Sequence, residues 1–505
     1  MSGLAKKLAG QTAVYGVSSI VGRVLTYLLV PLYTARFAAS EYGIVTELYA
    51  YVAFLNVVFT FGMETAFFRF ANRAGANRRK LYSQVLSLLL LSSAVLSGLV
   101  MLLSGPIAEI LKYPGKERFF IWLALVMAID AVVAIPFARL RLEGKAKKFA
   151  AIRLANVAAN VGLTLFFVVF CADVWQGKYL TGLRPLIGYI YDPDLGVGYV
   201  FWVNLLANAL FIPLLWRELT DFRFRLDWAQ VPALWRYGYP IMLMGLAGMI
   251  NETLDRPMLK YWLPEGFYPG QSNLTAVGVY GACYKLSIFM QLVIQAFRYA
   301  AEPFFFSQAQ EKNSPATFAV VLKWFTLCCA VIFVAVSLNL DILEHLFLRR
   351  PEYRTGVAVV PVLLLANLFL GVYYNLSVWF KLTDRTYFGT YISAGGALLT
   401  VVLNWLLIPH LGYLGCAFTT LACYFLMAFT CWWLGNRYFP VPYPVGRLAA
   451  WLLLAVGVVA VGWYVPIADW WLRQGAHVLL TLGFVAVLFV VERRTLPAAR
   501  VAAKP

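Results

Sequence analysis

Charged residues are scarce in this chain. Only 13% of its 505 residues are Asp, Glu, Lys or Arg, whereas 62% are hydrophobic, and the mean hydropathy is +0.73. A soluble protein of this length could not cover so much apolar surface with so few charges, so the composition predicts a polytopic membrane protein. The net charge of +18 does not indicate nucleic-acid binding, because basic residues of such proteins gather at the cytoplasmic ends of the spans.

Motifs of several enzyme and metal-binding classes are also missing. The sequence has no GxxxxGK[ST] phosphate loop, no HExxH and no CxxC. The three histidines, His345, His410 and His477, fall near predicted membrane boundaries, where a solvated helix end is the simpler interpretation. The seven cysteines show neither metal-ligand spacing nor a disulfide framework. We therefore expect no cofactor, no metal site and no enzymatic activity.

Hydrophobic runs of spanning length recur along the whole chain. They predict an all-α polytopic membrane protein with about fourteen transmembrane helices. The runs cover residues 10–36, 44–68, 82–104, 119–142, 148–171, 197–216, 235–262, 275–306, 316–340, 356–382, 386–409, 412–435, 446–466 and 475–492.

The distribution of basic residues predicts the orientation. If the N-terminus is cytoplasmic, 27 of the 42 Lys and Arg residues fall on the cytoplasmic side and 11 on the outer side. Positive charge is enriched in cytoplasmic loops, so this excess predicts that both termini are cytoplasmic. Arg349, Arg350 and Arg354 fit less well, because this topology places them outside.

Two halves of the chain resemble each other. Aligning Gly43 with Gly278 also aligns Tyr49 with Tyr284, and the offset is six spans. This predicts two six-helix lobes related by a pseudo-two-fold axis along the membrane normal. Chance similarity among glycines and aromatic residues of apolar helices is the alternative. We expect an N-terminal lobe at 1–225, a C-terminal lobe at 226–440, and two additional helices with a cytoplasmic tail at 441–505.

Charges inside the predicted spans are the most informative residues. They are Arg23, Glu47, Glu64, Asp130, Glu252, Asp255, Arg256, Lys285, Arg298 and Glu302. Glu252 and Arg256 are four residues apart, as are Arg298 and Glu302, so each pair can form on one helix face. Arg23 and Lys285 have no such local partner and must meet a carboxylate, water or an anionic ligand.

Arg23 belongs to a polar stripe on the first span. The stripe consists of Thr12, Tyr15, Ser19, Arg23, Thr26 and Tyr33. Most of the charged positions fall on spans 1, 2, 7 and 8, which are the leading helices of the two halves, and Asp130 on span 4 is the exception. Pro31, Pro136, Pro240 and Pro257 interrupt spans 1, 4 and 7 and predict bending points.

Two stretches resemble a known family. Residues 10–16, 31–34 and 41–43 resemble the start of bacterial polysaccharide biosynthesis flippases of the O-antigen type, and residues 404–419 resemble a turn between two later spans of that family. The Asp255-Arg256 pair is also similar. The family belongs to the superfamily that includes multidrug extruders and lipid II flippases.

This resemblance implies a function and a site. It implies alternating access and translocation of an undecaprenyl-pyrophosphate-linked oligosaccharide across the bacterial inner membrane, for O-antigen or exopolysaccharide synthesis, together with glycosyltransferases and a polymerase. The implied substrate-binding residues are Arg23, Arg256, Lys285 and Arg298, because cations hold phosphate oxygens. The candidates for H⁺ or Na⁺ coupling are Glu47, Glu64, Asp130 and Asp255.

Two other functions remain open at this point. A cation-coupled multidrug extruder of the same fold would favour a carboxylate on the first span, yet there is no acidic residue between Gly10 and Phe37. A membrane glycan polymerase or ligase would need a catalytic carboxylate or histidine on a substantial loop. The longest outer loop, about residues 172–196, is too short to form an enzyme domain.

Overall fold

The regular structure of the chain is helical. The structure is a computed structural model that describes residues 16, 20–73, 75, 77–308, 314–383, 385–465 and 467–493, and it contains no strand in that part of the chain. An apolar chain in a bilayer has to satisfy each backbone N–H and C=O within its own segment, which favours helices. The predicted all-α fold is confirmed.

The chain divides into two compact units, each described here by itself. The first unit comprises residues 1–281 with 400–405, and the second comprises 282–399 with 406–505. The first contains α2 (Val30–Arg36), α3 (Ala39–Thr60), α4 (Met63–Ala71), α5 (Arg78–Leu102), α6 (Ser104–Ile110), α7 (Glu117–Leu142), α8 (Ala146–Thr164), η1 (Leu165–Cys171), α9 (Ala172–Trp175), η2 (Thr181–Leu183), α10 (Arg184–Ile187), η3 (Pro193–Leu195), α11 (Gly198–Ala209), α12 (Phe211–Leu214), α13 (Trp216–Thr220), α14 (Val231–Thr253), α15 (Asp255–Trp262) and most of α16 (Asn273–Leu286).

The second unit begins near the end of α16. It contains α17 (Ile288–Gln308), α18 (Ser314–Leu338), α19 (Leu340–Phe347), η4 (Pro351–Gly356), α20 (Val359–Leu376), α21 (Val378–Leu382), most of α22 (Tyr387–Leu411), α23 (Tyr413–Tyr438), α24 (Val445–Tyr464) and α25 (Trp470–Glu492). The predicted division into lobes at residues 225 and 440 stays a prediction.

Most of the predicted spans correspond to helices. In the described part of the chain, ten helices are long and apolar enough to cross a membrane, or eleven if the bent pair α16–α17 is one span. The remaining three predicted spans differ. The first begins among residues that are not described, the sixth is the shorter apolar helix 198–214, and the seventh is divided into α14 and α15.

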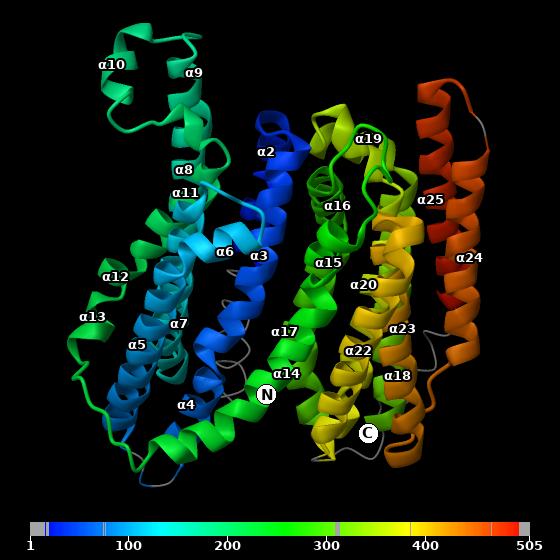
Figure 1. Cartoon of the computed structure of the whole chain (residues 1–505). Coiled ribbons are helices and arrows are strands. Elements are labelled where there is room, and N and C mark those ends of the chain that lie inside the picture. Colours follow the sequence, from blue (N-terminus) through cyan, green and yellow to red (C-terminus); the bar gives the residue numbers. More distant parts are fainter. Residues whose placement is uncertain are drawn as a thin grey trace. The chain divides into compact units, whose positions relative to one another are not determined.

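The first unit has its core among four neighbouring helices. In Figure 1, α5, α7, α8 and α11 run beside one another, and α7 packs against α3, α5 and α11. Buried aromatic rings hold this core, with the ring centroids of Phe119 and Phe201 5.1 Å apart and those of Phe137 and Phe211 5.3 Å apart. These helices therefore pack their apolar faces against one another inside the unit.

The second unit is organised around α18 and α20. α20 packs closely on α23 and α18, and α18 also packs on α24 and α25. One buried carboxylate ties the two C-terminal helices to α18. Glu492 is fully buried and accepts from Lys323 at 2.5 Å, Arg447 at 2.7 Å and Trp451 Nε1 at 2.9 Å. The charge is neutralised where lipid could not solvate it.

Only some of the predicted proline interruptions break a helix. α2 begins beside Pro31 and α15 begins just before Pro257, so spans 1 and 7 are interrupted there. Pro136 and Pro240 lie inside the continuous helices α7 and α14. A proline can remain inside a helix in a membrane because neighbouring groups satisfy the freed carbonyl. The helices therefore continue past these two prolines, and bending at them stays a prediction.

The two glycines aligned between the halves lie in contact. A Cβ atom on Gly278 of α16 would lie 1.8 Å from the carbonyl oxygen of Ala39 and 2.9 Å from the backbone nitrogen of Gly43, both at the start of α3. A Cβ atom on Gly43 would lie 2.1 Å from the carbonyl oxygen of Leu274. Only glycine allows the helix backbones to approach this closely.

This contact predicts that Gly278→Ala destabilises the protein. The added methyl group has no space, so α3 and α16 must separate, and we expect the free energy of unfolding to fall by about 1–3 kcal/mol. Thermal unfolding of the detergent-solubilised protein measures this. Gly162→Ala in α8 is the matched control, since nothing lies within 4 Å of the added atom. Equal unfolding midpoints for the two variants would contradict the prediction.

Candidate functional site

Arg23 lies in a helical segment, residues 20–27, that ends in a turn before α2. Its side chain is exposed, and the described part of the chain offers it no ion pair. An arginine within an apolar span is not stable against lipid tails, so an exposed one has to meet water or an anionic ligand. The first three residues of the predicted polar stripe, Thr12, Tyr15 and Ser19, lie outside the described residues.

Arg256 follows the break between α14 and α15. Its Nη1 donates to the Asp255 carboxylate at 2.9 Å and also to the main-chain carbonyl of Glu252. Asp255 accepts a second hydrogen bond from the hydroxyl of Tyr280 at 2.5 Å, and the Asp255 and Arg256 side chains are both buried. The predicted contact between positions 252 and 256 therefore involves the backbone of Glu252, while Asp255 supplies the carboxylate.

Glu47 on α3 is fully buried and holds a long-range ion pair. Lys260 on α15 lies 2.8 Å from its carboxylate, and Tyr51 donates to it at 3.1 Å. Tyr113, in the loop before α7, also donates a hydrogen bond to Glu47. The centre of its ring lies 3.9 Å from Lys260 Nζ. The partner of Glu47 is thus Lys260, and the arrangement joins α3, α15 and the loop 111–116.

Glu64 and Asp130, the other two predicted coupling carboxylates, have different surroundings. Glu64 on α4 forms an ion pair with Arg141 at the end of α7. Asp130, in the middle of α7, accepts a hydrogen bond from the neutral side-chain amide of Asn208 at 3.0 Å. Of the four predicted coupling carboxylates, Asp130 is the one for which the described residues provide no ion pair.

The remaining predicted cations, Lys285 and Arg298, belong to the bent span α16–α17. The two helices meet at an angle of 50° around Ser287, and Lys285 lies half-buried in the last turn before this bend. Arg298 is exposed, with its guanidinium carbon 4.1 Å from the centre of the Tyr374 ring. The side chain of its predicted partner, Glu302, lies outside the described residues.

A second cation shares a small pocket with Arg298. The pocket is formed by α17 and the junction of α20 with α21, and its polar lining residues are Arg298, Tyr374, Ser377 and Lys381. Two cations beside hydroxyl groups form an arrangement that can bind the oxygens of a phosphate.

An apolar groove lies on the other side of the same turn. It has a volume of about 350 Å³ and runs between α18, α20, α23 and α24. Leu376, Phe425, Phe429 and Leu452 are among its lining residues. Leu376 and Ser377 are consecutive, so one turn of the chain separates an apolar groove from a cationic pocket. This is the arrangement that a ligand with an anionic head and an apolar tail requires.

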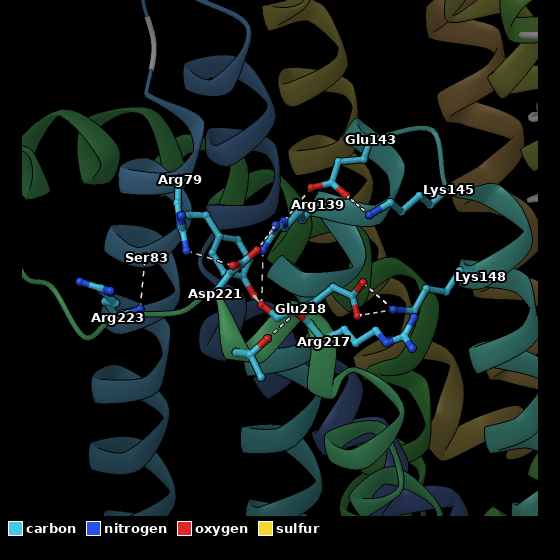
Figure 2. Close-up of polar contacts among 12 residues, drawn as sticks. Arg79, Ser83, Arg139, Glu143, Lys145, Lys148, Arg217, Glu218, Asp221 and Arg223 are labelled. Atoms are coloured by element: carbon cyan, nitrogen blue, oxygen red, sulfur yellow. Dashed lines mark hydrogen bonds and ion pairs between the residues drawn. The ribbon is translucent and has the colours of Figure 1, made fainter.

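An ionic network joins the start of α5 to the ends of α7 and α13 in the first unit (Figure 2). Arg139 lies 2.7 Å from Glu143 and 2.6 Å from Asp221, and Arg79 also pairs with Asp221 at 3.0 Å. The hydrogen bond from Arg139 holds the pKa of Asp221 below its usual value. Burial would raise the pKa of Glu143, but the hydrogen bonds from Lys145 and Arg139 outweigh it and lower that pKa. Both groups therefore stay ionised at neutral pH.

Sequence reasoning missed several residues of these clusters. Lys260 and Lys381 lie near the ends of the apolar runs 235–262 and 356–382 and are not among the predicted site residues. Their partners are distant along the chain, and no local spacing reveals such contacts. Among the described residues, no group of three or more His, Cys, Asp or Glu side chains is placed to hold a metal ion.

Comparisons with known proteins agree with this architecture. A model of the family described as "Polysaccharide biosynthesis protein" matches residues 35–176. No curated protein sequence matches the chain.

Solved structures show the same fold at low sequence identity. The chain is similar to the lipid II flippase MurJ in an inward closed conformation, with a TM-score of 0.69, 13% identity, and coverage of 94% of this chain and 99% of the flippase. It is also similar to an inward-facing multidrug resistance MATE family transporter, with a TM-score of 0.61, 12% identity, and coverage of 87% and 95%. The chain is also similar to a transporter of the MOP superfamily from Pyrococcus furiosus. The TM-score is 0.59 at 13% identity, and the match covers 88% of this chain and 96% of the transporter.

These comparisons confirm the resemblance found in the sequence. The chain has the multi-pass fold shared by flippases and multidrug transporters, and the family match lies within its first unit. A model of a polysaccharide biosynthesis family thus matches residues 35–176, and most of the chain shares its fold with solved structures of a lipid II flippase and of MATE transporters.

Proposed function

We propose that the protein translocates an undecaprenyl-pyrophosphate-linked oligosaccharide by alternating access. The observation that carries this proposal is the turn at Leu376 and Ser377, which has an apolar groove on one side and the Arg298–Lys381 pocket on the other. A polyprenyl chain fits the chemistry of the groove, and a pyrophosphate fits the chemistry of two cations. The similarity of the fold to transporters supports translocation.

The proposal includes the location and the partners of the protein. It places the protein in the bacterial inner membrane with both termini in the cytoplasm, supported by the excess of Lys and Arg on one side. There it would act as a monomer, after glycosyltransferases have built the oligosaccharide and before a polymerase extends it, in O-antigen or exopolysaccharide synthesis. Arg23, Arg256, Lys285 and Arg298 are the proposed substrate ligands.

The exposure of Arg23 and Arg298 distinguishes them from Arg256. Arg256 is held by Asp255, so its charge is already compensated and it would need to rearrange to bind a phosphate. Arg23 and Arg298 are exposed and have no ion pair in the described part of the chain. These two are the strongest candidates for direct phosphate contacts, since a guanidinium can bind two phosphate oxygens at once.

Asp130 is the strongest candidate for coupling to H⁺ or Na⁺. A coupling carboxylate has to take up and release a cation, and a fixed ion pair opposes this. Glu47, Glu64 and Asp255 are held by Lys260, Arg141 and Arg256, respectively. Asp130 meets only the neutral amide of Asn208 at hydrogen-bonding distance among the described residues.

A cation-coupled multidrug extruder is the second candidate, because MATE transporters share this fold. Two experiments separate the functions. A deletion strain of an extruder should become sensitive to drugs, whereas a deletion strain of a flippase should lose surface polysaccharide. Purified protein in vesicles should move labelled lipid-linked oligosaccharide only if it is a flippase. Release of elongated glycan in the same assay would indicate the third function, a polymerase or ligase.

The first prediction concerns Arg23. Arg23→Ala should lower transport of the lipid-linked oligosaccharide by about ten- to a hundredfold, because charge-assisted hydrogen bonds contribute about 1.5–3 kcal/mol. Arg23→Lys should recover part of the rate, since it keeps the charge but not the planar guanidinium. The measurement is the rate of labelled substrate flipping in proteoliposomes. Arg118→Ala, at an exposed position in the first turn of α7, is the control, and full activity of Arg23→Ala would exclude the proposed role.

The second prediction concerns Asp130. Asp130→Asn keeps a side chain that can accept from Asn208 but removes the charge, so the fold should be retained while the dependence of transport on an imposed H⁺ or Na⁺ gradient is lost. Transport is measured in proteoliposomes with and without each gradient. Glu64→Gln is the comparison, since it leaves Arg141 without its ion pair and should act on stability instead. An unchanged gradient dependence in Asp130→Asn would assign coupling to another group.

The third prediction concerns the apolar groove. Leu452→Trp should fill part of the groove and lower transport of the undecaprenyl-linked substrate severalfold, while a short-chain analogue that does not need the groove is transported normally. Leu479→Trp is the matched control, because Leu479 is exposed on α25 and does not line the groove. If both substrates lose transport equally in Leu452→Trp, the groove does not hold the lipid chain.

A further inference from the structure

The segment that follows α13 is tied to α5 through its backbone. The amide of Arg223 donates to Ser83 Oγ at 3.3 Å, that of Arg225 donates to Ser87 Oγ at 2.8 Å, and that of Asp227 donates to Gln84 Oε1 at 2.7 Å. Alternate amides of an extended segment thus point toward one helix, and the side chains of Arg223 and Arg225 are exposed. Figure 2 shows the Arg223 amide bonded to Ser83 with its side chain directed away.

The acidic residues of this segment already have partners, which are cations for Glu218 and Asp221 and neutral amide groups for Asp227. Glu218 is buried and accepts from Lys148 at 2.6 and 2.7 Å. Asp221 is held by Arg79 and Arg139 (Figure 2). Asp227 accepts from the amide of Ala229 and from Gln230. These contacts use every carboxylate between residues 216 and 228.

The arginines of the same segment have no such compensation. Arg217, Arg223 and Arg225 are exposed, and the described residues form no ion pair with any of them. Three large apolar side chains are exposed between them, Trp216, Phe224 and Trp228, at 64%, 64% and 66%. We call these six residues the linker strip.

The position of the linker strip matches the headgroup layer of a bilayer. It starts directly after α12, where the sixth predicted span ends, and it stops just before α14, where the seventh begins. Trp side chains at such boundaries favour the interface, and basic residues there attract anionic lipids. Because the backbone is fixed on α5, the arginines are presented with little loss of conformational freedom on binding.

We propose that the linker strip binds the headgroups of anionic phospholipids in the leaflet that faces it. The arginine guanidinium groups bind the phosphate and the headgroup charge, while Trp216, Phe224 and Trp228 insert among the glycerol and upper acyl groups. This binding needs no transport substrate and is independent of the proposed flippase function. An acidic protein segment is the other partner that could meet three arginines, and the exposed aromatic residues favour lipid.

The test uses the full-length protein and two lipids. Detergent-solubilised protein is titrated with phosphatidylglycerol or phosphatidylcholine, and bound lipid is measured by native mass spectrometry. Wild type should prefer phosphatidylglycerol, and R223Q/R225Q should weaken its binding about thirtyfold, since each arginine near an anionic surface contributes a factor of about five. The backbone bonds to Ser83 and Ser87 do not involve the altered side chains, so the variant should unfold at the wild-type temperature.

K112Q/R118Q is the charge-matched control. Lys112 in the loop between α6 and α7 and Arg118 in the first turn of α7 are exposed, and their substitution should leave lipid binding unchanged. Equal binding of the two lipids by wild type, or equal loss in both double variants, would overturn the proposal. So would a variant that keeps its affinity for phosphatidylglycerol but no longer binds a poly-glutamate peptide that wild type retains, since the strip would then be a protein site.

Discussion

A charge inside an apolar helix has to meet an opposite charge, water or a ligand, because the bilayer interior cannot solvate it. Most of this structure follows from how each charge satisfies that condition. Glu47 and Glu492 are fully buried, and cations from distant helices neutralise them. Removing one partner of a buried pair costs about 3–5 kcal/mol, so such pairs fix which helices lie together. Arg23 and Arg298 satisfy the condition differently, since they remain exposed and need something from outside the protein.

Several of the charges lie near helix breaks. Spans 1, 2, 7 and 8 are each interrupted, at Leu28, Phe61, Leu254 and Ser287, and these are the spans predicted to lead the two halves. Arg23, Asp255 and Lys285 lie within about one or two turns of these breaks. Backbone groups freed at a break are tolerated only where protein or water satisfies them, so a broken span marks a polar environment within the membrane. The same environment can accommodate the charges.

The sequence was sufficient for features that depend on local pattern. Apolar runs of spanning length predicted the helices, because length and hydrophobicity decide insertion, and eleven of the fourteen runs correspond to helices that could cross the membrane within the described residues. The alignment of Gly43 with Gly278 marked two equivalent positions, but only the structure shows their backbones in contact.

Features that depend on tertiary contact could not be predicted. Local spacing predicted a pair between the side chains of Glu252 and Arg256, whereas the arginine binds the carboxylate of Asp255, its neighbour in sequence, and the main-chain carbonyl of Glu252. Glu47 and Lys260 are more than two hundred residues apart, and no periodicity connects them. Lys381 lies at the end of an apolar run, so its place beside Arg298 depends on how α21 packs on α17. The site therefore needed the fold, although its residue types were visible in the sequence.

The size of the groove limits how a lipid-linked substrate can use it. At about 350 Å³ it lies near the lower end of pockets that enclose a drug-sized ligand, so it can hold only the part of a long polyprenyl chain nearest the headgroup. The rest of the chain has to stay in the bilayer, and only the anionic head needs protein ligands. A groove of this size would also suit a compact drug, so the groove alone does not separate the two functions. Arg298 and Lys381 in the adjoining pocket support the proposed substrate, because two cations attract an anionic head and repel a cationic drug.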